Sequence, residues 1–185
     1  VDPGNGAYAS ENGVLFDRQG TQLMQYPARR AGAYTIPASV TTIRARAFLG
    51  CHRLTELTMP AGLRSVEESA FAECLELTSA PLPDGLTHLG DHAFSSCSRL
   101  ASVAIPNSLT TLGRYAFAGC VQLASVRLPP TLETLSDGLF SDCQGLSTIE
   151  LPPGLTRIGD SGFRGSGLTR ISFPDSLRSI GAESF

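Results

Sequence analysis

Proline recurs in this chain at a fixed interval of 23 residues, and this interval constrains the fold more than any other feature. Phenylalanine repeats with the same period, and only the last proline interval is shorter, at 22 residues. A fixed period of roughly 20 to 29 residues predicts a solenoid, in which each repeat forms one coil and contacts only its neighbours. The prolines are Pro37, Pro60, Pro83, Pro106, Pro129, Pro152 and Pro174, and the phenylalanines are Phe48, Phe71, Phe94, Phe117, Phe140, Phe163 and Phe185.

Each position after a proline carries one type of side chain, which predicts columns of stacked side chains in the core. Aliphatic residues stand three and six residues after the proline, and an Ala-Phe pair begins ten residues after it in the first four coils. Cysteine follows in five coils at Cys51, Cys74, Cys97, Cys120 and Cys143, and Ser166 replaces it in the sixth. Because no single coil could bury these residues alone, the stacking of coils must supply the stability.

Apolar and polar residues alternate just before each proline, which predicts one short strand per coil. Stacked strands would form a parallel sheet with a spacing of about 4.8 Å, and each proline ends its strand because it lacks an amide hydrogen. Pro81 lies inside the corresponding segment Ser79–Pro83 and predicts an uneven sheet there. The predicted strands are Leu57–Met59, Val103–Ile105, Val126–Leu128, Ile149–Leu151 and Ile171–Phe173.

The first 36 residues lack the regular repeat. Residues 13–16 and 21–26 are strand-like and flank a four-residue turn, which predicts a β-hairpin. We therefore expect residues 1–36 to form an irregular N-terminal repeat and residues 37–185 to form one continuous solenoid of regular repeats. Solenoids need polar caps over their end coils, and neither end of the chain resembles one, so we expect a fragment of a longer chain.

Charge and motifs argue against several classes of function. The net charge of −3 gives no basic surface for nucleic acid, and no run of apolar residues is long enough to insert into a membrane. No nucleophile motif or phosphate-binding loop is present. We therefore expect no enzyme activity, no catalytic residues and no cofactor.

Two sets of residues could suggest a metal or a disulfide. Stacked cysteines would lie about 5 Å apart, which is within disulfide range. Their odd number and the lack of a Cys-x-x-Cys pair favour buried, reduced thiols. His88 and His92 flank Asp91, but a metal site needs three or four convergent ligands, so we expect two histidines in solvent-exposed turns and no bound metal.

The aligned coils read P-x-x-[LV]-x-x-[LIV]-x-x-x-A-F-x-x-C-x-x-L-x-x-[LIV]-x-[LIM]. This repeat resembles the BspA-like leucine-rich repeats of surface proteins from bacteria and some parasitic protists, over essentially the whole chain. The resemblance implies an α/β-type repeat: a leucine-rich repeat solenoid with a parallel β-sheet on one face and short strands and turns on the other. The later coils depart from the pattern, since Leu139 and Gly162 replace alanine and one residue is missing before Leu168.

The resemblance also implies a function. The family includes surface adhesins reported to bind host matrix and plasma proteins such as fibronectin and fibrinogen. It implies a cell-surface or secreted module that adheres to a host or extracellular-matrix protein. The charge and the lack of a long apolar run independently predict no nucleic-acid partner and no membrane insertion of this fragment. The alternative is a spacer solenoid that has no ligand of its own and holds another domain away from a surface.

The outward positions of the predicted strands form the candidate protein-binding face, because solenoids bind partners on their extended concave surface. The charged residues Arg127, Glu150 and Arg170 cluster at the later coils of this face. They could contact a protein partner, and the alternative interpretation is a solvated cross-strand charge pair. The face has no aromatic anchor, which favours weak or multivalent binding. Its residues are Glu56, Thr58, Ser79, Ser102, Ala104, Ser125, Arg127, Thr148, Glu150, Arg170 and Ser172.

Overall fold

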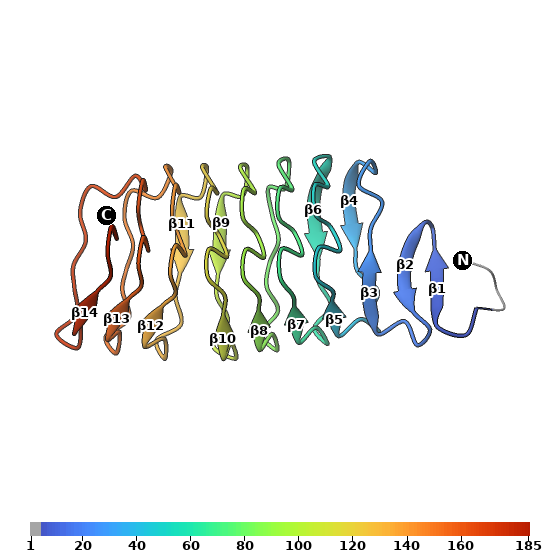
Figure 1. Ribbon diagram of the computed structural model, residues 1–185, viewed down its shortest axis with the longest axis horizontal. Helices are drawn as coiled ribbons and strands as arrows, with labels where there is room; N and C mark the ends of the chain where they lie inside the picture. The colour runs from blue at the N-terminus through green and yellow to red at the C-terminus, as the bar shows by residue number, and fades with distance from the viewer. Residues whose placement is uncertain (1–4) are drawn as a thin grey trace.

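The computed structural model describes residues 5–185 and is a β-solenoid whose coils stack along one long axis (Figure 1). The expected leucine-rich repeat solenoid with parallel strands is confirmed. The α/β label is wrong, because the described residues contain strands and turns and no helix. We number the regular coils 1 to 7 from their prolines, as residues 37–59, 60–82, 83–105, 106–128, 129–151, 152–173 and 174–185.

The N-terminal residues form an antiparallel meander that joins the solenoid. Its strands are β1 (Tyr8–Glu11), β2 (Val14–Asp17) and β3 (Gln22–Gln25). The predicted antiparallel pairing of β2 with β3 is observed. The strand β1 was not predicted, although Asn12 and Gly13 have positive φ angles of 49° and 80° and form the two-residue turn that the Asn-Gly pair favours.

Short parallel strands line one edge of the solenoid, which is the lower edge in Figure 1. They pair through backbone hydrogen bonds that we call the short-strand ladder, and β3 begins it by pairing with the first of them. The ladder divides after β10, because β12 pairs with β13 and not with β10. Its members are β5 (Thr42–Ile43), β7 (Ser65–Val66), β8 (His88–Leu89), β10 (Thr111–Leu112), β12 (Thr134–Leu135), β13 (Arg157–Ile158) and β14 (Ser179–Ile180).

A second set of hydrogen bonds, the Ala-Phe ladder, joins every pair of neighbouring regular coils. The Phe48 N–H donates to the Ala70 carbonyl at 2.7 Å, and the equivalent bonds continue to Phe163 and Ser184 at 2.8 Å. Two left-handed residues flank the ladder in the first six coils, such as Ser69 (φ 53°) and Glu73 (φ 60°) in coil 2. These residues turn the chain sharply on both sides of the phenylalanine, which leaves no room for a helix.

The predicted strand face carries a third ladder, which is discontinuous. Its strands are β4 (Gly32–Thr35), β6 (Leu54–Thr58), β9 (Ser102–Ala104) and β11 (Ser125–Arg127). β4 pairs with β6 and β9 pairs with β11, but Pro81 separates the two pairs, as the sequence predicts. The strands predicted at residues 149–151 and 171–173 do not form, and those segments are extended without ladder bonds.

The core consists of the predicted phenylalanine and cysteine columns. From Phe48 to Phe163, the phenylalanine side chains are at most 1% exposed and stack coil upon coil. All five cysteines are buried and free, and four of their thiols donate to the carbonyl of a phenylalanine in the preceding coil at 3.2–3.3 Å. Burial raises the pKa of the Cys143 thiol to about 12.

The phenylalanine column widens along the chain. Ring centroids lie 4.8 Å apart for Phe48 and Phe71, but 6.0 Å apart for Phe117 and Phe140. Leu139 occupies the buried position that alanine fills in coils 1 to 4. Its larger side chain lies between the coils next to the widest ring spacing, so it contributes to their separation.

Candidate protein-binding site on the strand face

All eleven candidate residues are exposed on the outer side of their segments. The predicted alternation of exposed and buried positions holds in the early coils, where Leu57 is 3% and Val103 is 7% exposed. It weakens in the later coils, where the inward side chains of Val126, Ile149 and Ile171 are only half-buried. The candidate face is therefore closed at its beginning and open near its end.

The junction between coils 4 and 5 is the place where the short-strand ladder and the strand face are both interrupted. In coil 4, the amides of Thr110 and Thr111 donate to the Thr87 carbonyl, at 2.9 Å and 3.1 Å. The equivalent amides of Glu133 and Thr134 make no such bond to coil 4. On the strand face, β11 does not pair with residues 148–151 either. Among the three lines of bonds, only the Ala-Phe ladder holds this junction in full.

Ser136 explains part of this separation. The equivalent position is glycine in coils 3, 4, 6 and 7, and a Cβ atom on Gly113 would overlap the backbone of Gly90. Ser136 carries a Cβ atom and therefore cannot approach Gly113 as closely as Gly113 approaches Gly90. Its hydroxyl donates instead to the Leu112 carbonyl at 2.5 Å, so a side-chain bond stands where the other coils have a backbone bond.

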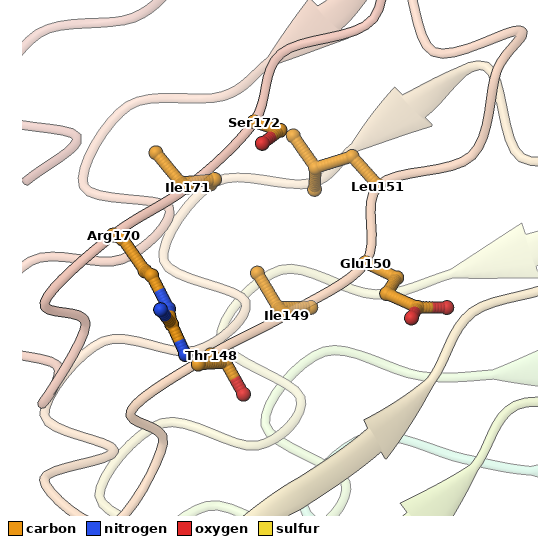
Figure 2. Close-up of a pocket in the computed structure, with 7 residues that line it drawn as sticks. All are labelled: Thr148, Ile149, Glu150, Leu151, Arg170, Ile171 and Ser172. Atoms are coloured by element: carbon orange, nitrogen blue, oxygen red, sulfur yellow. The ribbon is translucent and has the colours of Figure 1, made fainter.

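Two adjoining depressions open on the strand face at its later coils, and we call them together the strand-face hollow. The first has a volume of about 510 Å³ and lies between residues 124–128 and residues 148–150. The second has a volume of about 430 Å³ and lies between residues 148–151 and 170–172 (Figure 2). Six of the predicted binding residues line the hollow: Ser125, Arg127, Thr148, Glu150, Arg170 and Ser172.

The missing residue in coil 6 accounts for the second depression. Gly167 passes so close to coil 5 that a Cβ atom there would overlap the Gln144 carbonyl oxygen. The Thr169 amide still donates to the Ser147 carbonyl at 3.3 Å. Beyond that bond no backbone hydrogen bond joins residues 148–151 to 170–172. The two coils therefore touch at the shortened turn and open where coils 1, 3 and 4 have a strand.

The charged side chains of the hollow are unpaired. Arg127, Glu150 and Arg170 form no ion pair within residues 5–185, whereas Arg44 and Glu67 pair at 2.7 Å elsewhere on the surface. Figure 2 shows the charged ends of Arg170 and Glu150 on opposite sides of the depression. The cross-strand charge pair is thus not formed, and these groups are free to contact a partner.

The histidines show no metal-binding arrangement. His88 is half-buried in β8 and does not lie in an exposed turn, which corrects the expectation for that residue. His92 is exposed and stacks on Tyr115, with ring centroids 5.2 Å apart. The part of the chain that the structure describes holds no cluster of three metal-ligating side chains. Nor does it contain an apolar helix of membrane-spanning length.

The sequence of the chain matches the profile of a known repeat family. The profile of the BspA type leucine-rich repeat region matches residues 30–147 and 110–185, with six copies. The chain belongs to the BspA-type leucine-rich repeat family. Repeat solenoids of this family are consistent with protein-interaction or surface modules and are usually non-catalytic. No curated protein matches the chain.

Solved structures of bacterial leucine-rich repeat proteins share this architecture. A leucine-rich repeat protein of Treponema pallidum is 29% identical, with a TM-score of 0.79, and the match covers 97% of this chain and 85% of that one. A leucine-rich repeat protein of Bacteroides ovatus is 27% identical, with a TM-score of 0.78, and the match covers 98% of this chain and 55% of that one. The present chain therefore spans about half the length of the Bacteroides protein.

The pneumococcal vaccine antigen PcpA has the same fold. It is 22% identical, with a TM-score of 0.71, and the match covers 96% of this chain and 43% of that one. At this level of identity the likeness concerns architecture alone.

Proposed function

We propose that this chain is a cell-surface or secreted module that adheres to a host or extracellular-matrix protein through the strand-face hollow. The strand-face hollow supports this proposal, because it combines unpaired charges with partly exposed apolar side chains on a face suited to protein recognition. A similar protein of Faecalibacterium prausnitzii is described as a leucine-rich cell surface protein. This description agrees with a surface location for this chain.

We further propose that the chain has no enzyme activity of its own. The sequence has no nucleophile motif, and the strand-face hollow pairs its charged groups with no histidine or cysteine. Burial raises the thiol pKa values of Cys120 and Cys143, and all five cysteines lie in the core, so they are poor nucleophiles. The proposed role is therefore recognition rather than catalysis.

Binding to immobilised matrix and plasma proteins at physiological salt tests the adhesion proposal. We expect saturable binding of the 185-residue chain, which weakens when Arg127, Glu150 and Arg170 are replaced together by alanine. A matched control replaces Arg18, Glu133 and Arg157, which removes the same charges from exposed positions outside the hollow. Circular dichroism establishes that both variants are folded.

Three outcomes would change the proposal. Equal loss in the hollow variant and the control variant would indicate a nonspecific charge effect. Full binding by the hollow variant would move the binding site to another face. No binding by the folded chain to any protein of the panel would contradict adhesion and favour the spacer function.

A further inference from the structure

The backbone of the hollow offers hydrogen-bonding groups that the chain itself leaves unused. Within residues 5–185, no N–H or carbonyl group of residues 148–151 or 170–172 forms a hydrogen bond with another part of the chain. In coils 3 and 4 the equivalent residues pair as β9 and β11. Extended segments with free backbone groups are templates for the addition of another extended chain. The backbone therefore favours a peptide over a small molecule as the occupant.

The floor of the hollow is apolar. The side chains of Ile149, Leu151 and Ile171 are half-buried and border the space between the two segments, as Figure 2 shows. An extended peptide directs alternate side chains to one face, so one residue in every two can contact this floor. A partner that contacts this floor would remove its apolar surface from water. In the early coils, the equivalent side chains are already buried within the chain itself.

The charges of the hollow specify one kind of side chain on that peptide. Arg170 lines both depressions and Arg127 lines the first of them, and neither pairs with an acidic group of the described chain. Glu150 is the only acidic residue among the lining residues, and it points away from Arg170 (Figure 2). A guanidinium group binds a carboxylate through charge-assisted hydrogen bonds, which are stronger than neutral ones. The two arginines therefore favour an acidic side chain.

We infer that the strand-face hollow binds an extended peptide segment of a protein partner, which carries an acidic side chain beside Arg170 and apolar side chains at alternate positions. This inference rests on the proposed function and names the class of segment recognised. The backbone of the peptide would satisfy free groups of residues 148–151 and 170–172, its apolar side chains would cover Ile149 and Ile171, and its carboxylate would pair with Arg170.

Synthetic peptides test the inference on the 185-residue chain. The probe is an end-blocked, fluorescent peptide of five residues, in which valine alternates with threonine and glutamate, and its analogue carries lysine in place of glutamate. Fluorescence anisotropy at physiological salt measures both affinities. We expect the glutamate peptide to bind about tenfold more tightly, which corresponds to one charge-assisted hydrogen bond. N-methylation of its alternate amides should weaken binding to a similar degree, because it removes backbone donors.

A charge reversal in the protein locates the contact. Arg170→Glu should abolish the preference for the glutamate peptide and favour the lysine peptide, and the variant should fold because Arg170 is exposed and unpaired in the described chain. Arg157→Glu is the matched control, since Arg157 is exposed on β13 in the short-strand ladder. It should leave both affinities unchanged.

The outcomes separate this inference from the adhesion proposal. Equal affinity for both peptides, indifference to N-methylation, or no saturable binding of the glutamate peptide would overturn the inference. If matrix or plasma proteins still bind the chain in that case, adhesion stands and uses a different kind of contact. If the peptide binds as expected but no protein of the panel does, the hollow recognises an extended acidic segment of another partner.

Discussion

Coils 1 to 4 and coils 5 to 7 share one repeat, but they are joined differently. The early coils are held by the short-strand ladder and the Ala-Phe ladder, with phenylalanine rings as close as 4.8 Å. At the coil 4–coil 5 junction the rings stand 6.0 Å apart, and neither the short-strand ladder nor the strand face pairs across it. Beyond the junction the short-strand ladder resumes, but the strand face does not.

The comparison shows that the stacked core and the hydrogen-bonded ladders impose separate requirements. Phe140 remains fully buried in a coil whose short strand does not pair with the coil before it. Core stacking tolerates an increase of about 1 Å in spacing, because apolar contact is not directional. A backbone hydrogen bond does not tolerate it, because its strength falls steeply with distance and angle. The strand-face hollow lies where the core continues and the strand-face ladder does not.

The largest expected effect is the loss of a ring from the phenylalanine column. Phe71→Ala and Phe117→Ala should each lower the free energy of unfolding by about 3 to 5 kcal/mol, as large-to-small changes in a packed core do. Phe71→Ala should cause the larger loss in the free energy of unfolding, since the centroids of both neighbouring rings lie within 4.9 Å of the Phe71 ring centroid. Urea denaturation measures both changes, with Leu49→Ala at a 37% exposed position as the control. A loss below about 1 kcal/mol for Phe117 would show that its column is not a packed core.

Replacement of Leu139 tests whether its side chain holds coils 4 and 5 apart. A buried leucine changed to alanine usually costs about 2 to 5 kcal/mol. Leu139→Ala should cost only about 1 kcal/mol, because the two coils can move together and fill the space as alanine allows in coils 1 to 4. Leu146→Ala, at another fully buried position of coil 5, is the control and should cost the usual amount. Equal losses in the two variants would mean that Leu139 does not separate the coils.

Amide hydrogen exchange measures the open ladder directly. Glu133, Thr134 and Ser136 should exchange at least about tenfold faster than the equivalent amides of coil 4, because they lack backbone acceptors. Ser136→Gly should slow the exchange of Glu133 and Thr134 and stabilise the chain by about 1 kcal/mol, as bonds worth about 0.5 to 1.5 kcal/mol each form against the entropy cost of glycine. Unchanged exchange in this variant would leave Leu139 as the cause of the separation.

The smallest expected effect concerns a bond between coils 3 and 4. Asp91 accepts from the Arg114 amide at 2.8 Å and pairs with its guanidinium group at 3.1 Å. Partial burial raises the pKa of Asp91, but these contacts with Arg114 outweigh it and hold the pKa below its ordinary value. The stabilisation of the folded state by the Asp91 carboxylate is therefore complete above the unfolded-state pKa of about 3.9. It is lost as pH falls through the lower folded-state pKa.

Asp91→Asn should accordingly lower the free energy of unfolding by less than about 1 kcal/mol at neutral pH, since the pair is largely exposed. The difference from the unmodified chain should vanish in strong acid. Asp84→Asn removes the same charge from an exposed residue without a partner in the described chain and should have no effect. A cost for Asp91→Asn that persists in acid would show that the carboxylate charge is not its source.

The sequence predicts the phenylalanine and cysteine columns of the core well, because the same residue types recur at the same position of each coil. Phe94 and Cys97 lie in the core as their positions require, and Pro81 interrupts the strand ladder since it has no amide hydrogen. The strand β1 could also have been predicted from Asn12 and Gly13, which favour a two-residue hairpin turn. In each case the identity of one or two residues decides the local structure.

The geometry of the hollow is not predictable in the same way. The alternating residues 149–151 and 171–173 have the pattern of strands, yet a strand also needs a neighbour at hydrogen-bonding distance. That distance depends on Leu139, Ser136 and the 22-residue length of coil 6 acting together on the stacking. All of these departures are visible in the sequence, but their combined displacement of the backbone is a property of the packed coils. The exposed residues could be predicted, and the depression between them could not.

The unbroken Ala-Phe ladder has a mechanical consequence. A rod whose segments are bonded fully along one edge and incompletely along the others has different bending stiffness in different planes. At the coil 4–coil 5 junction, the Ala-Phe ladder and the bond from the Gly145 amide to the Val121 carbonyl at 2.8 Å would resist bending, whereas curvature that opens or closes the short-strand edge would meet little resistance from backbone bonds. Traction on a tethered solenoid would therefore concentrate its bending at residues 128–136. If the strand-face hollow binds a partner as proposed, the same bending would change the width of the binding site.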